Sequence, residues 1–374
     1  MRWSIRIFAV SAVLQTMAWS QSPPAVPRQR PLALQPLPEP PVPADPLELV
    51  SGDAQTVQTP EQRQAATALL SKARALSNVR AQPYDLKTAF TTFGSSSSDG
   101  SWTLEDMSPA RDVYRWTAQG PGYSGVNLYD HQLLYSNQPS SAIPLRLTQV
   151  REALFFVYPG IGPYMSLRTA DANLNGLPLH CVLTAHGFAG KAFSGGRNWE
   201  KSEYCMDANS GLLVICSSAP GMYVHFDYTS AIRFHGKIIP GTFTISEAGR
   251  PIIEARTESV TDPTGLSPTL FQPTGLTSIG LGSIMTAAAR VRSLIRPSSI
   301  APGGNTAVNL VAVHAVAAPD GSLSETEILA SSDPSLNQTG LDRAAHWQVL
   351  RQAQSGATPQ SHEVIFLFEF RSSS

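Results

Sequence analysis

Apolar and polar positions alternate along most of the chain between Tyr84 and about Val260. Short runs rich in β-branched and aromatic residues are separated there by clusters of Gly, Ser, Asn and Asp, which is typical of strands joined by turns. Between Met222 and Tyr228 every second position belongs to one apolar face. A period of two places those side chains on the same side of a strand. The pattern therefore predicts an antiparallel sheet with one buried face.

Helical spacing precedes this region. Thr59 can cap a helix with its hydroxyl group, and Pro60 is tolerated in a first turn. The apolar residues that follow share one helical face: Ala65, Ala66, Leu69, Leu70, Ala73 and Leu76. A second helical stretch is predicted near Leu145–Val157. We expect an α+β fold in which a curved antiparallel sheet, an open half-barrel, follows an N-terminal helix.

A smaller pattern occupies the C-terminal part of the chain. Strands are predicted at Ala307–Ala317, Leu323–Leu329 and Val364–Phe370, and a helix is predicted after Asp333. The order is ββαβ, in a segment just long enough for one sheet and one helix to close a core. The sequence thus predicts a second, small domain.

Proline and glycine indicate the connections between these parts. Residues 23–46 hold ten prolines, and such a run favours an extended, semi-rigid spacer. Residues 263–305 are rich in Pro, Thr and Gly at both ends, with a short helix predicted at Met285–Ile295. The predicted division is a signal peptide at 1–20, a Pro-rich linker at 21–58, a β domain at 59–262, a linker with a short helix at 263–305 and a small domain at 306–371.

The first twenty residues have the pattern of an export signal. Arg2 and Arg6 precede the apolar stretch Ile7–Leu14, and small residues follow in Ala18-Trp19-Ser20. A membrane-spanning helix needs about 20 apolar residues, which is more than this stretch offers. We therefore predict cleavage, which gives a soluble periplasmic protein. Retention would instead give an inner-membrane anchor.

The cysteines and the charge balance narrow the expectations further. The formal net charge is −1, whereas nucleic-acid binding needs clustered Lys and Arg; we therefore expect no nucleic-acid partner. Cys205 and Cys216 flank a turn sequence at 207–211, which favours a disulfide across a hairpin, although Cys181 could equally pair with Cys205 from a neighbouring strand.

Motifs that carry catalytic chemistry do not occur in the sequence. It contains no Gly-x-Ser-x-Gly, no His-Glu-x-x-His and no Cys-x-x-Cys. The histidines lack the spacing of metal ligands. We therefore predict a protein that is not an enzyme and that has no metal site and no cofactor.

The C-terminal segment, residues 305–370, resembles the TonB C-terminal domain family. The matching positions are Pro319-Asp320-Gly321, Leu323, Ser331-Ser332-Asp333-Pro334, Leu336, Ala344, Trp347, Gly356, Pro359 and the closing run Val364–Phe370. The resemblance implies a sheet with one helix, whose open strand edge accepts an extended peptide from an envelope protein. It assigns that edge to the last strand, with Val364, Phe366, Phe368 and Phe370.

Residues 59–260 resemble the lipoprotein-carrier fold of the LolA/LolB-like proteins. The features are one helix followed by many antiparallel strands, with Gly236-Lys237-Ile238-Ile239-Pro240 before the strand Thr242–Ser246. The resemblance implies an unclosed barrel whose concave face shelters acyl chains. Aromatic positions in this region are candidate ligand contacts, with ordinary core packing as the other interpretation: Tyr114, Trp116, Phe155, Phe226 and Phe243.

Together these patterns predict a non-enzymatic periplasmic or cell-envelope binding protein. A carrier-like domain for an apolar or acylated ligand would be joined to a module that binds an outer-membrane or other envelope protein by strand addition. Two alternatives remain open at this point. One is a membrane-anchored, TonB-type energy transducer for outer-membrane transport, and the other is an envelope hydrolase.

Overall fold

The computed structural model describes residues 47, 49–50, 54–94, 98–110, 112–141, 143–186, 199, 201–281, 292–295, 308–318, 320–347 and 362–371. All of them belong to one compact unit that extends from Glu39 to Ser374. The predicted signal peptide and most of the predicted Pro-rich linker lie outside these ranges. Among the helices within them, none combines the length and apolarity needed to cross a membrane.

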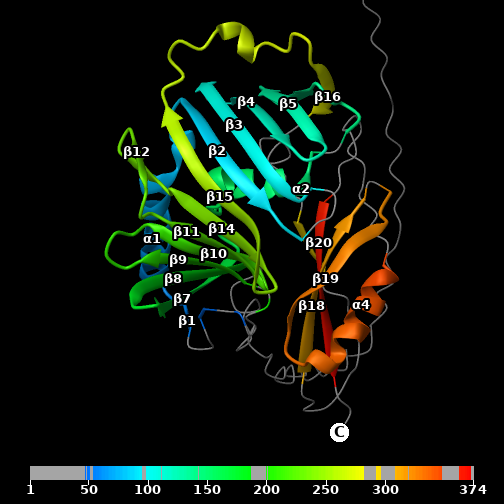
Figure 1. Cartoon of the computed structure of the whole chain (residues 1–374). Helices are drawn as coiled ribbons and strands as arrows, with labels where there is room; N and C mark the ends of the chain where they lie inside the picture. Colours follow the sequence, from blue (N-terminus) through cyan, green and yellow to red (C-terminus); the bar gives the residue numbers. More distant parts are fainter. Residues whose placement is uncertain are drawn as a thin grey trace, which may run out of the picture. The chain divides into compact units, whose positions relative to one another are not determined.

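A curved antiparallel sheet makes up the larger module of the described chain (Figure 1). Its strands are β1 (Gln55–Thr56), β2 (Tyr84–Thr92), β3 (Gly100–Ala110), β4 (Val113–Gly120), β5 (Tyr123–Asp130), β6 (Leu133–Ser136), β7 (Met165–Leu174), β8 (Leu177–His186), β9 (Ser202–Asp207), β10 (Leu213–Ala219), β11 (Met222–Asp227), β14 (Thr242–Glu247), β15 (Arg250–Thr261) and β16 (Thr277–Leu281). The order of neighbours is β1-β7-β8-β9-β10-β11-β14-β15-β2-β3-β4-β5-β6-β16. Because β1 and β16 end the sheet without pairing to each other, the barrel is open, and the predicted fold class is confirmed.

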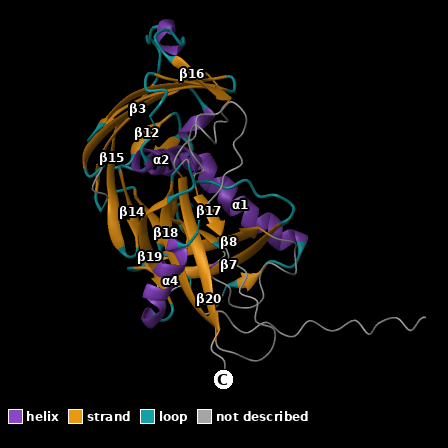
Figure 2. Ribbon diagram, turned by 90° about the vertical axis from the view of Figure 1, so that its right-hand side faces the viewer, coloured by secondary structure: helices purple, strands orange, loops and turns teal. Residues whose placement is uncertain are grey.

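Two helical segments lie on the concave side of this sheet (Figure 2). Helix α1 (Pro60–Ser77) begins at the predicted cap, where the Thr59 hydroxyl accepts from the Gln62 amide. Helix α2 (Leu145–Arg151) continues directly as a π-helical turn, η2 (Glu152–Phe156). Apolar side chains of α1, α2 and η2 share one core cluster with the inward side chains of the strands. The predicted helices therefore fill the hollow of the sheet.

A four-stranded sheet forms the C-terminal module. Its elements are β17 (Arg292–Ile295), β18 (Val308–Ala317), β19 (Leu323–Ser331), the 3₁₀ turn η5 (Pro334–Leu336), α4 (Asn337–Ala345) and β20 (His362–Arg371). The strand order is β17-β20-β18-β19. From β18 onward the elements follow the predicted order ββαβ, which is confirmed.

Both faces of the C-terminal sheet are buried. Val313, Phe366 and neighbouring residues pack with Ala344 of α4. On the other face, Leu310 and Ile365 share a cluster with residues of the large module, among them Met222. A strand buried on both faces has a nearly continuous apolar sequence, which explains the largely apolar runs of β18 and β20.

The segment predicted as a linker, 263–305, contributes strands to both sheets. Thr277–Leu281 forms β16 and pairs with β6. Arg292–Ile295 forms β17 and pairs in parallel with β20, so a helix over Met285–Ile295 is wrong for these four residues; residues 285–291 lie outside the described ranges. In both places an open strand edge supplies hydrogen-bond partners that a local sequence pattern cannot reveal.

The prediction of a free partner-binding edge at the last strand is wrong from Glu363 to Phe366, where β20 is paired on both sides. This strand pairs with β18 along its whole length and with β17 from Glu363 to Phe366. The side chains of Val364, Phe366 and Phe368 are buried against α4, and the Phe370 ring lies under the Arg343 guanidinium. An edge consists of backbone groups, whereas side chains stand perpendicular to the sheet. The apolar pattern of these four residues therefore reflects packing of their side chains in the core and does not indicate a free strand edge.

The predicted Cys205–Cys216 disulfide is also wrong. Cys181 and Cys205 face each other on β8 and β9 and are joined by a disulfide. In the β9–β10 pair, Cys205 lies opposite Ile215, and Cys216 lies opposite Tyr204. Neighbouring positions in a strand point to opposite faces, so Cys216 belongs to the concave core and Cys205 to the convex side.

Removing this disulfide should lower the stability of the fold. The Cys181→Ala/Cys205→Ala double variant frees a loop with a sequence separation of 24 residues, and closure of a loop of that size stabilises a fold by about 3 kcal/mol. Urea unfolding of this variant measures the loss. Cys216→Ala is the control, with an expected loss of at most about 1 kcal/mol. A disulfide-linked peptide that contains Cys216 in the wild-type digest would contradict the assignment.

Candidate functional site

The concave face of the large sheet gathers the five aromatic residues that the sequence singles out. Tyr114, Trp116, Phe155, Phe226 and Phe243 all belong to the same core cluster, and each is less than 7% exposed. Phe226 and Phe243 form a tilted ring pair with centroids 6.0 Å apart. The tertiary structure thus brings the five together, in a closed interior.

A small cavity of about 20 Å³ lies in this interior. It is bounded by the end of α1, by η2 and by strands of the sheet. Its apolar lining includes Leu86, Leu154, Val157, Leu213, Phe226 and Ile239. A space of this size holds about one water molecule. An acyl chain therefore needs the helical segment to move.

Tyrosine hydroxyl groups form the polar side of the cavity. Tyr158, just after η2, donates to the carbonyl of Ala73 at 3.1 Å and also contacts the Ser77 hydroxyl. Tyr228 donates to the carbonyl of Leu213 at 3.0 Å. Burial raises the pKa of both phenols, so both remain protonated donors. The bond from Tyr158 ties the end of η2 to α1.

A buried ion pair holds α2 inside the sheet. The Arg151 guanidinium contacts Asp106 Oδ2 at 2.9 Å, and its Cζ atom lies 3.8 Å from the centre of the Trp116 ring. Tyr84 donates to the other oxygen of Asp106 at 2.8 Å. Burial raises the pKa of Asp106, while Arg151 and the Tyr84 hydrogen bond oppose that rise. The Asp106 carboxylate thus accepts a hydrogen bond from α2 at one oxygen and from β2 at the other.

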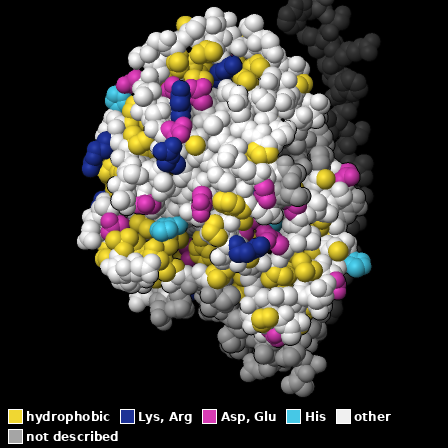
Figure 3. Space-filling view, viewed as in Figure 1, with side chains coloured by type: hydrophobic (Ala, Val, Ile, Leu, Met, Phe, Trp, Pro, Cys, Tyr) yellow, Lys and Arg dark blue, Asp and Glu magenta, His cyan; other side chains and the backbone are white. Residues whose placement is uncertain are grey.

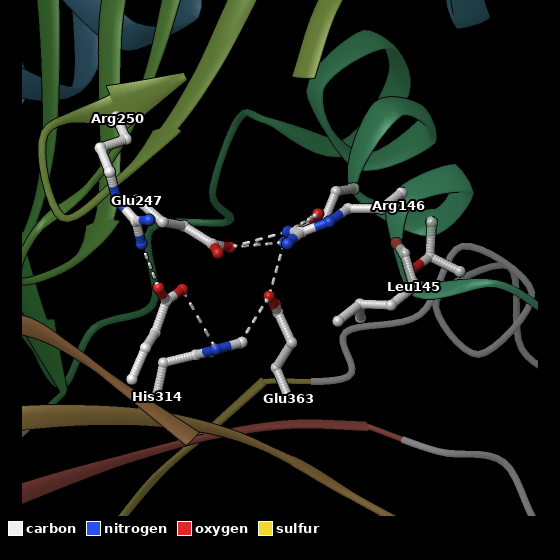
Figure 4. A network of polar contacts seen from close by, with 9 residues as sticks. Leu145, Arg146, Glu247, Arg250, His314 and Glu363 are labelled. Atoms are coloured by element: carbon white, nitrogen blue, oxygen red, sulfur yellow. Dashed lines mark hydrogen bonds and ion pairs between the residues drawn. The ribbon is translucent and has the colours of Figure 1, made fainter. Parts of the chain in front are cut away.

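A second polar network connects α2 to the C-terminal module (Figure 4). Arg146 Nη1 and Gln149 Nε2 donate to Glu247 Oε1 at 3.2 and 3.0 Å. Gln149 Nε2 also donates to Glu363 Oε1 of β20 at 2.6 Å. Arg146, Gln149, Glu247 and Glu363 are all buried. One turn of α2 therefore bonds to both sheets at once.

The same network continues on β18 and β19. His314 Nε2 lies 3.3 Å from Glu363 Oε1, and His314 Nδ1 lies 3.8 Å from Glu327 Oε1. Arg250, at the start of β15, donates to Glu327 Oε2 at 2.6 Å. Burial opposes protonation of His314, but the carboxylates of Glu363, Glu247 and Glu327 outweigh it and raise the pKa of His314. Burial first, and then the carboxylate of Glu247, raises the pKa of Glu327.

Sequence reasoning missed this network because its members come from separate elements and form no motif. A weak signal was nevertheless present. His314 interrupts the apolar run of β18, and Glu363 begins the apolar run of β20. Charged side chains at positions where a strand pattern places core residues are seldom buried unless they are paired. A charged residue within an apolar strand pattern was therefore the sequence feature that indicated a buried polar site.

On the face shown in Figure 3, basic side chains lie singly among polar and apolar ones. This arrangement agrees with the near-neutral charge of the chain.

Comparison with known proteins yields structural likenesses at low identity. A LolA superfamily protein from Nitrosomonas europaea matches with a TM-score of 0.39 at 11% identity, over 55% of this chain and 97% of that one. A putative outer membrane lipoprotein-sorting protein domain from Vibrio parahaemolyticus matches with a TM-score of 0.36 at 9% identity, over 56% of this chain and 97% of that one. MucB, in its complex with MucA(peri), matches with a TM-score of 0.24 at 13% identity, over 57% of this chain and 61% of that one. No family model and no curated protein sequence matches the chain.

Proposed function

We propose that this chain is a non-enzymatic, periplasmic carrier that takes the acyl chain of a lipid or lipoprotein into the concave face of its large sheet. The observation that carries the proposal is the apolar cavity between the sheet and η2. An acyl chain is a suitable ligand for an apolar interior because its burial removes apolar surface from water. Each CH₂ group that becomes buried contributes about 0.8 kcal/mol to binding.

Entry of a ligand requires η2 to leave the hollow. Movement of η2 is sufficient: α2 stays in place through the Arg151–Asp106 pair and the bonds of Arg146 and Gln149, whereas the end of η2 is tied to α1 by Tyr158. A π-helical turn is rare and often occurs at functional sites. The ligand would then replace the apolar side chains of η2, including Phe155, against Phe226 and Phe243.

The C-terminal module is proposed to bind an envelope protein by strand addition. Among the described strands, β19 stands at the end of the order β17-β20-β18-β19, so its outer side is the place where a further strand would pair. This location replaces the one expected on β20. The transducer alternative needs residues 1–20 as an anchor, and those residues lie outside the described ranges.

Binding of the fluorescent fatty acid cis-parinaric acid tests the carrier proposal. We expect the full chain to bind it saturably with a Kd tighter than about 100 µM, the affinity of a single acyl chain for a bilayer. Tyr158→Phe removes the bond that ties η2 to α1, and a hydrogen bond of this kind contributes about 1 kcal/mol. Because weakening the closed form increases the binding-competent fraction, this variant should bind about fivefold more tightly.

Tyr164→Phe is the matched control, since the Tyr164 side chain is 67% exposed and six residues further along the chain. It should bind as the wild type does. Absence of saturable binding by both the wild type and Tyr158→Phe would overturn the carrier proposal. Equal affinities for these two proteins would overturn the displacement of η2.

A further inference from the structure

Three potential metal ligands meet where the large sheet contacts the C-terminal sheet: Glu247 of β14, His314 of β18 and Glu327 of β19. Each offers one ligand atom, and these atoms lie within 4.8 Å of one another. We infer that they form a site for a divalent transition-metal ion, for which Zn²⁺ is the best match, and that the bound ion joins the two modules. One imidazole and two carboxylates are ligand types that zinc commonly takes.

Buried polar atoms without hydrogen bonds point to a ligand at this place. His314 is 1% exposed, and within the described part of the chain neither of its ring nitrogens makes a hydrogen bond of normal geometry. Glu247 is 0% exposed, and its Oε2 likewise has no hydrogen-bond partner among the described residues. Leaving such a group unsatisfied costs about 1–3 kcal/mol. A cation bound between these atoms would remove that cost.

The remaining atoms of the ligand side chains are held by a second layer of contacts. Glu247 Oε1 accepts from Arg146 and Gln149, and Glu327 Oε2 accepts from Arg250. These contacts leave Glu247 Oε2 and Glu327 Oε1 for the ion. Contacts of this kind orient the ligands of known metal sites and sustain their affinity.

Glu363 has a separate role beside the imidazole ring. Its Oε1 lies 3.3 Å from His314 Nε2 (Figure 4). A small rotation of the ring would align a proton on Nε2 with this carboxylate and leave the lone pair of Nδ1 for the metal. A carboxylate that orients a histidine in this manner is a common feature of zinc sites.

The distances are compatible with tetrahedral coordination. With metal–ligand bonds of 2.0–2.2 Å, neighbouring ligand atoms of a tetrahedron are about 3.4 Å apart. His314 Nδ1 and Glu327 Oε1 are 3.8 Å apart. The three ligand atoms lie within 4.8 Å of one another, so binding needs a contraction of at most about 1.4 Å, which rotation of the two glutamate side chains can supply.

The charges in the network leave a place for a cation. Glu247, Glu327 and Glu363 carry three negative charges, and Arg146 and Arg250 carry two positive ones. With a neutral imidazole, the sum is −1. The competing occupant is a proton, either on His314, where it would make a buried ion pair with Glu363, or between the carboxyl groups of Glu247 and Glu327. The experiment separates these two occupants.

Titration of the metal-stripped full chain with Zn²⁺, followed by isothermal calorimetry, tests the site. We expect one high-affinity Zn²⁺ per chain. His314→Gln and Glu327→Gln should each weaken binding by at least tenfold. The control is His180→Gln, which alters an exposed histidine that pairs with Asp171 at 2.7 Å, and it should bind as the wild type does. Glu327 is only partly buried, so Glu327→Gln keeps the test valid if His314→Gln fails to fold.

Titration with Co²⁺ identifies the ligand atoms. The expected spectrum shows visible d–d bands without the near-ultraviolet thiolate band that the third cysteine, Cys216, would give. A thiolate band would overturn the assignment. Absence of saturable Zn²⁺ binding by the wild type, or equal affinity in the wild type and Glu327→Gln, would overturn it as well and leave the proton as the occupant.

Discussion

Replacing Asp106 by Ala is expected to lower the free energy of unfolding by about 3–5 kcal/mol. The substitution leaves the Arg151 guanidinium buried within the sheet without the carboxylate that it contacts at 2.9 Å. It also removes the acceptor of the Tyr84 hydroxyl, which is itself buried. The loss is large because an uncompensated charge in the interior cannot recover its hydration. Urea unfolding followed by circular dichroism measures it.

The neighbouring residue on the same strand provides the control. Glu105 pairs with Lys87 at 2.9 Å, but the two side chains are 36% and 50% exposed. Glu105→Ala should therefore cost less than about 1 kcal/mol. A double variant, Asp106→Leu with Arg151→Met, should recover much of the loss, since apolar residues can replace a buried ion pair. Equal losses for Asp106→Ala and Glu105→Ala would refute the buried-pair explanation.

Gly221→Ala should be the second strongly destabilising change, because it forces apart the two modules. Gly221 lies in the turn between β10 and β11 with φ +71°, and an added Cβ would lie 2.3 Å from the backbone oxygen of Leu329 in β19. The left-handed conformation costs about 1–2 kcal/mol for alanine. Relief of the overlap should add about 1–3 kcal/mol, because a backbone atom cannot rotate away as a side chain can.

Gly122→Ala isolates the conformational part of this effect. Gly122 has φ +68°, and an added Cβ would meet nothing within 4 Å. Its expected loss is the conformational cost alone. Thermal unfolding and limited proteolysis compare the two variants, and Gly221→Ala should also expose the contact between the modules to the protease. Identical stability and identical proteolysis would show that the turn does not dock tightly on β19.

Local patterns were sufficient for the antiparallel sheet region, the helix before it and the ββαβ segment, but not for β16 and β17. The alternation that predicts strands in the large sheet reflects one buried and one exposed face, and the Thr59 cap with Pro60 marks the start of α1 in both sequence and structure. The aromatic candidates were also predictable as a group. Large apolar side chains on a common strand face must converge when the sheet curves, as Phe226 and Phe243 do.

Pairing between distant segments was not predictable in this way. The cysteine partner depends on the register of β8 and β9, which a one-residue shift would reverse. β17 is a strand because β20 offers it backbone partners. The polar network with Gln149 and Glu363 joins residues 214 positions apart in the sequence, so no local motif could reveal it.

The sequence by itself determined an α+β chain of antiparallel strands, a capped helix before them and a ββαβ segment at the end. These features follow from periodicity and capping, which act over a few residues. Only the tertiary structure decided that α2 and η2 fill the concave face, that Cys181 bonds to Cys205, and that Glu247, His314 and Glu327 meet. Burial and charge compensation depend on which surfaces come into contact, and that is a property of the folded chain as a whole.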